Sequence, residues 1–167
     1  MSAPAVLVHF VEPWSQLYSD SKVLPTLIVF GHIAALVFAG GLAVTLDRAT
    51  LRAARGPAEF RWRQLEDLER AHRLVLTGLA LSFVTGVLLF TADLETYFGS
   101  WIYWTKMTMI VLLLVNGFLM TRAESRIRLA PNASDDDGWK RLRFSAVASL
   151  LLWFAIALAG VALGNAL

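Results

Sequence analysis

The sequence contains no cysteine among its 167 residues. Disulfide bonds, thiolate metal ligands and cysteine nucleophiles are therefore excluded. Histidine is scarce as well, so any imidazole chemistry depends on His9, His32 or His72. The formal net charge of +2 is small, and the distribution of charge along the chain is therefore more informative than its sum.

Apolar residues are abundant and make up 57% of the chain, against about 45–50% in soluble globular proteins. The excess is concentrated in four runs, and about 20 apolar residues are enough for a helix to cross a bilayer. The sequence therefore predicts an all-α protein, a four-helix transmembrane bundle in contact with lipid. The expected spans are about 23–47, 74–92, 101–122 and 144–165.

The segment before the first span, residues 1–22, is too polar to cross the membrane. It is expected to lie at the membrane surface, with Trp14 and Tyr18 as anchors. Residues 23–167 would then form the transmembrane domain. No cleavable signal peptide is visible, so the first span is expected to act as its own insertion signal.

The connections between the spans have distinct patterns. Gly56-Pro57 should end the first helix, and residues 58–73 have the spacing of an amphipathic extension that leads into the second span. Residues 93–100 are expected to form a short acidic loop, and the PNASDDDG stretch, residues 131–138, a mobile loop. Asp47 beside Arg48 is interpreted as a charge pair at a helix end.

Basic residues gather in two of these connections, after the first and third spans. The positive-inside rule places both connections in the cytoplasm and both termini on the opposite side of the membrane. The expected location is the bacterial inner membrane, with several passes. Because this rule already accounts for the basic residues, no nucleic-acid partner is predicted.

Small residues recur at a spacing of four in the first two spans. Gly31, Ala35, Ala39 and Ala43 lie on one face of the first span, and Gly78, Ser82 and Gly86 lie on one face of the second. Such faces allow two helix backbones to approach closely. The first and second spans are therefore expected to pack against each other.

His32 is the ionisable residue nearest the middle of the first span, roughly 13 Å below the membrane boundary. Ionisable residues inside membranes are often functional. A neutral imidazole beside a face of small residues suits a haem iron and its flat macrocycle. The alternative is a structural histidine that bonds across the helices to a hydroxyl such as that of Ser82 or Thr85.

Lys106 lies in the same leaflet, roughly 7 Å below the boundary. One interpretation is a cation near His32 that holds a propionate or another anion, or relays a proton. The other is a lysine that extends to the lipid headgroups. Asn116, deeper in the third span, is expected to hydrogen-bond between helices.

The other candidate ligands are less favourable. His9 is expected to be solvated or interfacial, and His72 lies at the opposite membrane face. With no second histidine inside the membrane, a haem would need a single ligand, a site shared across a homodimer, or an unusual ligand such as a methionine of the third span. Copper could bind through histidine and methionine, but no dense cluster of these residues supports it.

Three motifs carry a resemblance to a group of four-helix bacterial membrane proteins: GHIAALVFAGGL, TGVLLF and WTKMTMIVLLLVNGFL. The chain resembles the CopD-type copper-resistance membrane domain and is similar to HemJ-type protoporphyrinogen oxidases over residues 23–165. The resemblance implies His32 and Lys106 as the cofactor-binding site, with His32 as the metal ligand. The chain departs from the HemJ-type signature at LAVTLDRATL, and has Phe38-Ala39 where the CopD type has tryptophan.

Three functional hypotheses follow. The first is a protein that binds haem b or a related porphyrin, for electron transfer or porphyrin handling. The second is a non-enzymatic accessory or assembly subunit of a larger membrane complex, and the third is a copper-handling membrane module. The sequence identifies no substrate, redox partner or enzyme activity.

Overall fold

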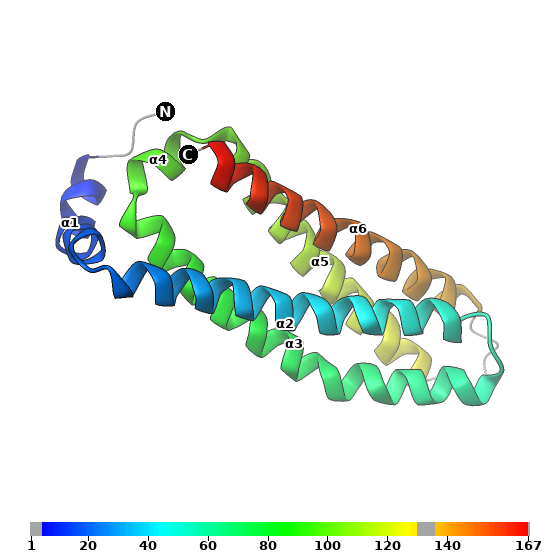
Figure 1. Ribbon diagram of the computed structural model, residues 1–167. Helices are drawn as coiled ribbons and strands as arrows, with labels where there is room; N and C mark the ends of the chain where they lie inside the picture. Colours follow the sequence, from blue (N-terminus) through cyan, green and yellow to red (C-terminus); the bar gives the residue numbers. More distant parts are fainter. Residues whose placement is uncertain (1–4, 130–135, 167) are drawn as a thin grey trace.

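The computed structural model describes residues 5–129 and 136–166, and these residues are almost entirely helical, with no strand among them. The six helices are α1 (Ala5–Asp20), α2 (Val23–Ala53), α3 (Ala58–Ala92), α4 (Leu94–Gly99), α5 (Trp101–Leu129) and α6 (Asp136–Ala166). The four longest, α2, α3, α5 and α6, are long and apolar enough to cross a membrane. The prediction of a four-helix transmembrane bundle is confirmed (Figure 1).

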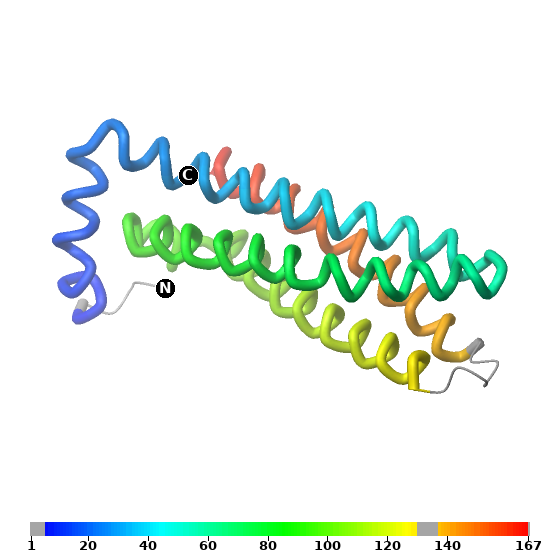
Figure 2. Tube along the Cα trace, turned by 90° about the horizontal axis from the view of Figure 1, so that it is seen from below, coloured from blue at the N-terminus to red at the C-terminus, as the bar shows by residue number. Residues whose placement is uncertain are grey.

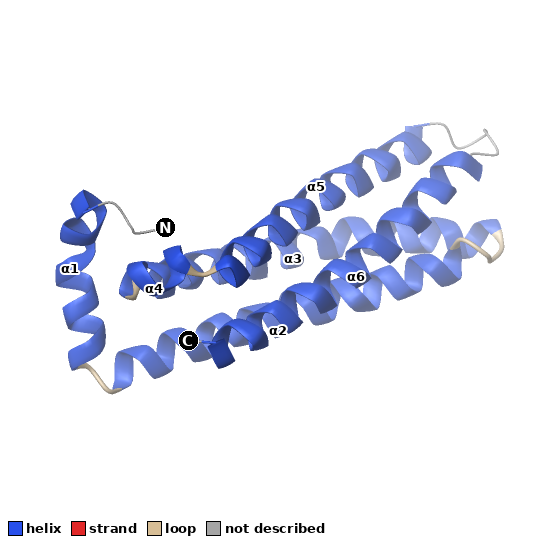
Figure 3. Ribbon diagram, turned by 90° about the horizontal axis from the view of Figure 1, so that it is seen from above, coloured by secondary structure: helices blue, strands red, loops and turns tan. Residues whose placement is uncertain are grey.

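The bundle consists of two closely packed pairs, α2 with α3 and α5 with α6, and the pairs meet mainly along α2 and α6 (Figure 3). α1, α4 and the last turns of α6 lie at one end of the bundle, here called the α1 end (Figure 1). The turn between α2 and α3 lies at the other, here called the Gly56 end. As predicted, Gly56-Pro57 separates the two helices.

The close approach of α2 and α3 comes from the small residues of both helices. A Cβ atom added to Gly78 would lie 2.8 Å from the Cβ of Ala39, and Ala35 and Ala39 are both buried. Because any larger residue at position 78 would clash with Ala39, only glycine there allows the two helices to approach so closely. The predicted packing of the first two spans is confirmed.

The four long helices extend beyond the predicted spans at the Gly56 end, and the extensions form a core of their own. Its buried members are Ala53, Ala54, Leu65, Leu68, Ala123, Ile127, Trp139 and Leu142. All of them lie outside the four predicted apolar spans. Within the most apolar stretch of each helix, by contrast, only 11% to 28% of the residues are buried. The outward faces there are apolar, as contact with lipid requires.

Several local predictions are corrected. Residues 94–99, expected in a loop, form the short helix α4. The inner side of the amphipathic extension was expected to carry Phe60 or Arg61 with Leu65, Leu68 and His72. Leu65 and Leu68 are buried, together with Gln64 and Ala71, whereas Phe60 and His72 are exposed. Of the expected loop 131–138, residues 136–138 begin α6, and residues 131–135 lie outside the described residues.

α1 runs across the end of the bundle at a steep angle to α2 (Figure 2). Two of its side chains bind carbonyl groups in the last turns of α3: Trp14 Nε1 donates to Leu88 O at 3.1 Å, and Ser15 Oγ donates to Ala92 O at 2.7 Å. The carbonyl of Ala92, at the end of α3, lacks a partner within the helix backbone. α1 therefore caps the end of α3, and Trp14 points to α3.

Candidate functional site

His32 lies in the α1 half of α2, with its ring against α3. Its Nδ1 atom is 3.0 Å from the carbonyl oxygen of Ser82 and 3.0 Å from Thr85 Oγ1. The Thr85 hydroxyl donates to Leu81 O at 2.8 Å, so its oxygen is available as an acceptor. Because a carbonyl oxygen only accepts, Nδ1 carries the proton and donates it. In the neutral ring, the lone pair then lies on Nε2.

Glycine makes room for this ring at the α3 backbone. A Cβ atom added to Gly86 would lie 3.3 Å from Cε1 of His32, which is closer than a side chain normally comes. No hydrogen bond to Nε2 occurs within residues 5–129 and 136–166. The hydrogen bonds to Nδ1 thus fix the orientation of the ring and leave Nε2 without a partner in the described part of the chain. Histidines that bind metals are oriented in the same way, by a hydrogen bond from the nitrogen that does not bind the metal.

Lys106, on α5, lies close enough to His32 for the two side chains to interact electrostatically. Its Nζ atom would be 3.6 Å from a Cβ atom at Gly160, so the ammonium lies against α6. Among the described carboxylates, none pairs with it. The structure therefore brings His32 and Lys106 into one region between the helix pairs.

The remaining predicted candidates lie elsewhere. His9 is exposed on α1 and bonds to Glu12 at 3.2 Å. His72 lies in the Gly56 half of α3, away from His32. Asn116 Nδ2 donates to Ser145 O of α6 at 2.9 Å, which confirms its predicted role between helices. Met109 packs into the core around Trp153.

Asp47 is where the structure differs most from the sequence-based interpretation. The residue was expected in a charge pair with Arg48 at the membrane surface, but it is 3% exposed. Its Oδ2 atom has no hydrogen-bond partner in the part of the chain that the structure describes. The sequence did contain a sign that Asp47 faces the other helices. Asp47 continues the series Gly31, Ala35, Ala39 and Ala43 at the same spacing of four. Helical geometry turns that face inward.

Asp47 lines a cavity of about 270 Å³ in the Gly56 half of the bundle. All four long helices contribute to its wall, which is mostly apolar. The polar groups on it include Asn116, Ser149, Glu124 and His72. Glu124, which the sequence analysis did not consider, follows Asn116 and Met120 on the inner face of α5.

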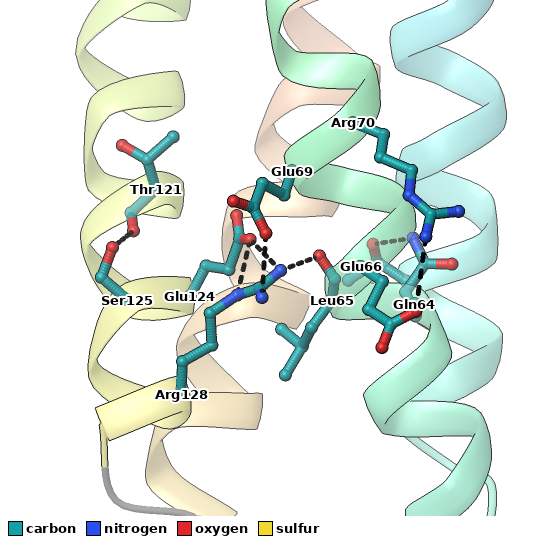
Figure 4. Close-up of polar contacts among 10 residues, drawn as sticks. Gln64, Leu65, Glu66, Glu69, Arg70, Thr121, Glu124, Ser125 and Arg128 are labelled. Carbon is teal, nitrogen blue, oxygen red and sulfur yellow. Dashed lines mark hydrogen bonds and ion pairs between the residues drawn. The ribbon is translucent and has the colours of Figure 1, made fainter.

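Glu124 also belongs to an ion-pair network between α3 and α5 (Figure 4). Arg128 Nη2 lies 3.0 Å from Glu124 Oε1, and Arg128 Nη1 lies 3.0 Å from Glu69 Oε2. Arg128 also donates to the carbonyl oxygen of Leu65. Glu124 is 12% exposed and Arg128 29%, so this network is partly shielded from water.

A cluster of three or more His, Asp or Glu side chains that could bind a metal ion is absent from the described residues. Comparison with protein-family models, with curated proteins and with solved structures found no match. The resemblance to the CopD-type and HemJ-type proteins therefore stays a prediction.

Proposed function

We propose that the chain is a haem- or porphyrin-binding multi-pass protein of the bacterial inner membrane, with Nε2 of His32 as the axial ligand. The observation that carries this proposal is the hydrogen bond from Nδ1 to the Ser82 carbonyl, which leaves Nε2 as the donor atom. A bound haem would supply a one-electron redox centre, whereas an iron-free porphyrin would be a cargo. A single imidazole is enough for a five-coordinate haem, so the proposal needs no second histidine.

Lys106 supports the same proposal through its charge. A half-buried ammonium without a carboxylate partner is costly in an apolar environment, and an anionic group beside it offsets that cost. A propionate of the macrocycle is such a group. In this arrangement His32 would bind the iron and Lys106 would hold the propionate.

The orientation belongs to the proposal as well. Arg48, Arg52 and Arg55 lie at the Gly56 end, close to the turn between α2 and α3. The positive-inside rule then places the Gly56 end in the cytoplasm and the α1 end, with both termini, on the other side. His32 and Lys106 would lie in the outer leaflet.

One observation favours the second hypothesis, an accessory subunit in which His32 is structural. The same hydrogen bonds from Nδ1 to Ser82 O and Thr85 Oγ1 tie α2 to α3 without any ligand. The small-residue face that suggested room for a partner helix or for a flat macrocycle, however, is occupied by α3 in the chain itself. A partner or a second copy would have to use the apolar outward faces.

The first test is a reduced-minus-oxidised visible spectrum of the purified protein, expressed with ample haem supply. Wild type should show haem bands, His32→Ala should lose them, and His72→Ala should keep them, because His72 lies in the other half of the bundle. Lys106→Met should retain less haem than wild type. Metal analysis of the same samples detects copper.

Bands that persist in His32→Ala would contradict the assignment of the ligand. A flat wild-type spectrum would contradict haem binding, and the sample would then be examined for porphyrin fluorescence. If that is absent too and a stoichiometric membrane protein co-purifies, the accessory-subunit hypothesis is favoured. Copper bound in wild type and lost in His32→Ala would favour the third hypothesis.

A further inference from the structure

The cavity in the Gly56 half of the bundle has no role in the site around His32. Asp47 and His32 are 15 residues apart on α2, or about 22 Å at about 1.5 Å per residue. The cavity volume of about 270 Å³ corresponds to roughly nine water molecules at about 30 Å³ each. It is therefore a separate space, large enough for a small organic molecule.

The chemistry of this cavity is set by one uncompensated carboxylate. Asp47 is 3% exposed, and its Oδ2 atom is without a hydrogen-bond partner among the described side chains and backbone groups. The hydroxyl of Ser149, on α6, lies beside the carboxyl group and also lines the cavity. A buried carboxylate with one hydroxyl neighbour is costly unless a cation or a proton joins it.

The second acid on the wall does not compete for the same cation. Glu124 is paired with Arg128 at 3.0 Å, and Arg128 is shared with Glu69. His72 lies at the edge of the cavity near Glu124 and interacts with it electrostatically. Glu124 thus already has an ion-pair partner, which it shares with Glu69, whereas no ion pair to Asp47 occurs in the described ranges.

The walls indicate what kind of cation fits. Leucine, valine, phenylalanine and tryptophan side chains, among them Leu79, Phe118 and Trp153, provide most of the surface. A small metal ion would need several oxygen ligands, and a group of three acidic or histidine side chains is not found in the described structure. Apolar walls with a few polar groups are typical of sites for organic ligands.

We propose that this cavity binds a monovalent organic cation, in which a protonated amine pairs with Asp47 and an apolar body lies against the leucine and aromatic side chains. Asn116 and Ser149 provide the polar contacts beside the ammonium group. The aromatic rings on the wall can add cation–π attraction. The site uses no residue of the His32 region, so it does not depend on haem binding.

The test uses cyclohexylammonium as the probe, titrated by calorimetry into the full chain in nanodiscs of neutral lipid, with empty nanodiscs as the blank. Wild type should bind one equivalent. Asp47→Asn should weaken binding by about 30-fold or more, because the buried partner of the charge is removed. Asp67→Asn, at an exposed acid of α3, is the matched control and should leave the affinity unchanged. Cyclohexanol, which is neutral, should bind wild type as weakly as the amine binds Asp47→Asn.

A second variant keeps the test valid if Asp47→Asn does not fold. Gly117 lines the cavity, and a Cβ atom added there meets nothing within 4 Å. Gly117→Leu should therefore fold, narrow the cavity and weaken amine binding. Gly41→Leu, at another open position that does not line this cavity, is its control.

Two results would overturn the proposal. The first is that wild type shows no saturable binding of the amine, or that Asp47→Asn and Gly117→Leu both bind the amine with the affinity of wild type. The second is that wild type gives a heat of binding with sodium ions but none with the amine, and that Asp47→Asn loses the sodium signal. That result would assign the carboxylate to a metal ion. Loss of haem from His32→Ala with amine binding retained would support both sites independently.

Discussion

The two ends of the bundle are held together in different ways. At the Gly56 end, large side chains such as Leu65, Trp139 and Leu142 pack into a buried core. Towards the α1 end, large side chains such as Phe30 and Phe83 face outward, and the helices meet through small residues.

This difference follows from the surroundings of each end. In lipid, apolar side chains gain little by leaving an apolar solvent, so close packing and polar contacts hold the helices together. The core at the Gly56 end lies beyond the apolar spans, where water is the alternative and burial itself is stabilising. The His32 region is in the part of the molecule where side-chain packing contributes least.

The largest expected effect is the loss of a core side chain at the Gly56 end. Leu65 is 1% exposed, and Leu65→Ala should lower the free energy of unfolding by about 2–5 kcal/mol. Leu158, in the span of α6, is 70% exposed, and Leu158→Ala should change it by less than about 0.5 kcal/mol. Equilibrium unfolding in mixed detergent micelles measures both, and equal effects would contradict the comparison.

An intermediate effect is expected where the α2 and α3 backbones meet. Gly78→Ala places a Cβ atom 2.8 Å from the Cβ of Ala39, and such overpacking should cost about 1–3 kcal/mol. The control is Gly117→Ala, because the added atom meets nothing within 4 Å. If Gly78→Ala is as stable as wild type under the same unfolding conditions, then the small residues do not determine how closely the helices approach.

The smallest effect is expected for the hydrogen bond between α5 and α6. Asn116→Leu removes the donor to Ser145 O while keeping a similar shape, and should lower the free energy of unfolding by about 0.6 kcal/mol. The same unfolding assay applies. A loss as large as that of Leu65→Ala would mean that polar contacts within the spans are as important as the core beyond them.

The sequence predicted the fold well because the strongest signal, long apolar runs, reports directly on the membrane. The packing of α2 on α3 was also predictable, since glycine and alanine at a spacing of four leave few other arrangements. The helix extensions at the Gly56 end were only partly foreseen. Their core forms between residues far apart in the chain, such as Leu65 and Leu142, and the periodicity of one segment does not show which segments meet.

The site residues were harder to predict than the fold. His32 was singled out because a histidine is rare in an apolar run. Asp47 was misinterpreted because an acid next to an arginine at the end of a span resembles a surface charge pair, although its helical face points inward. Glu124 lies in a mixed polar segment where acids are common. Asp47 and Glu124 differ from ordinary surface acids in being buried. Whether a residue is buried depends on which helices pack around it, and the sequence does not show this directly.

The position of α1 also has a consequence for the order of assembly. Trp14 and Ser15 are synthesised early, but they bind carbonyl groups of Leu88 and Ala92, 74 and 77 residues later. α1 can dock only after α3 has emerged and crossed the bilayer. Until then α1 has no docking site on α3, and its docking marks the completion of the first helical hairpin.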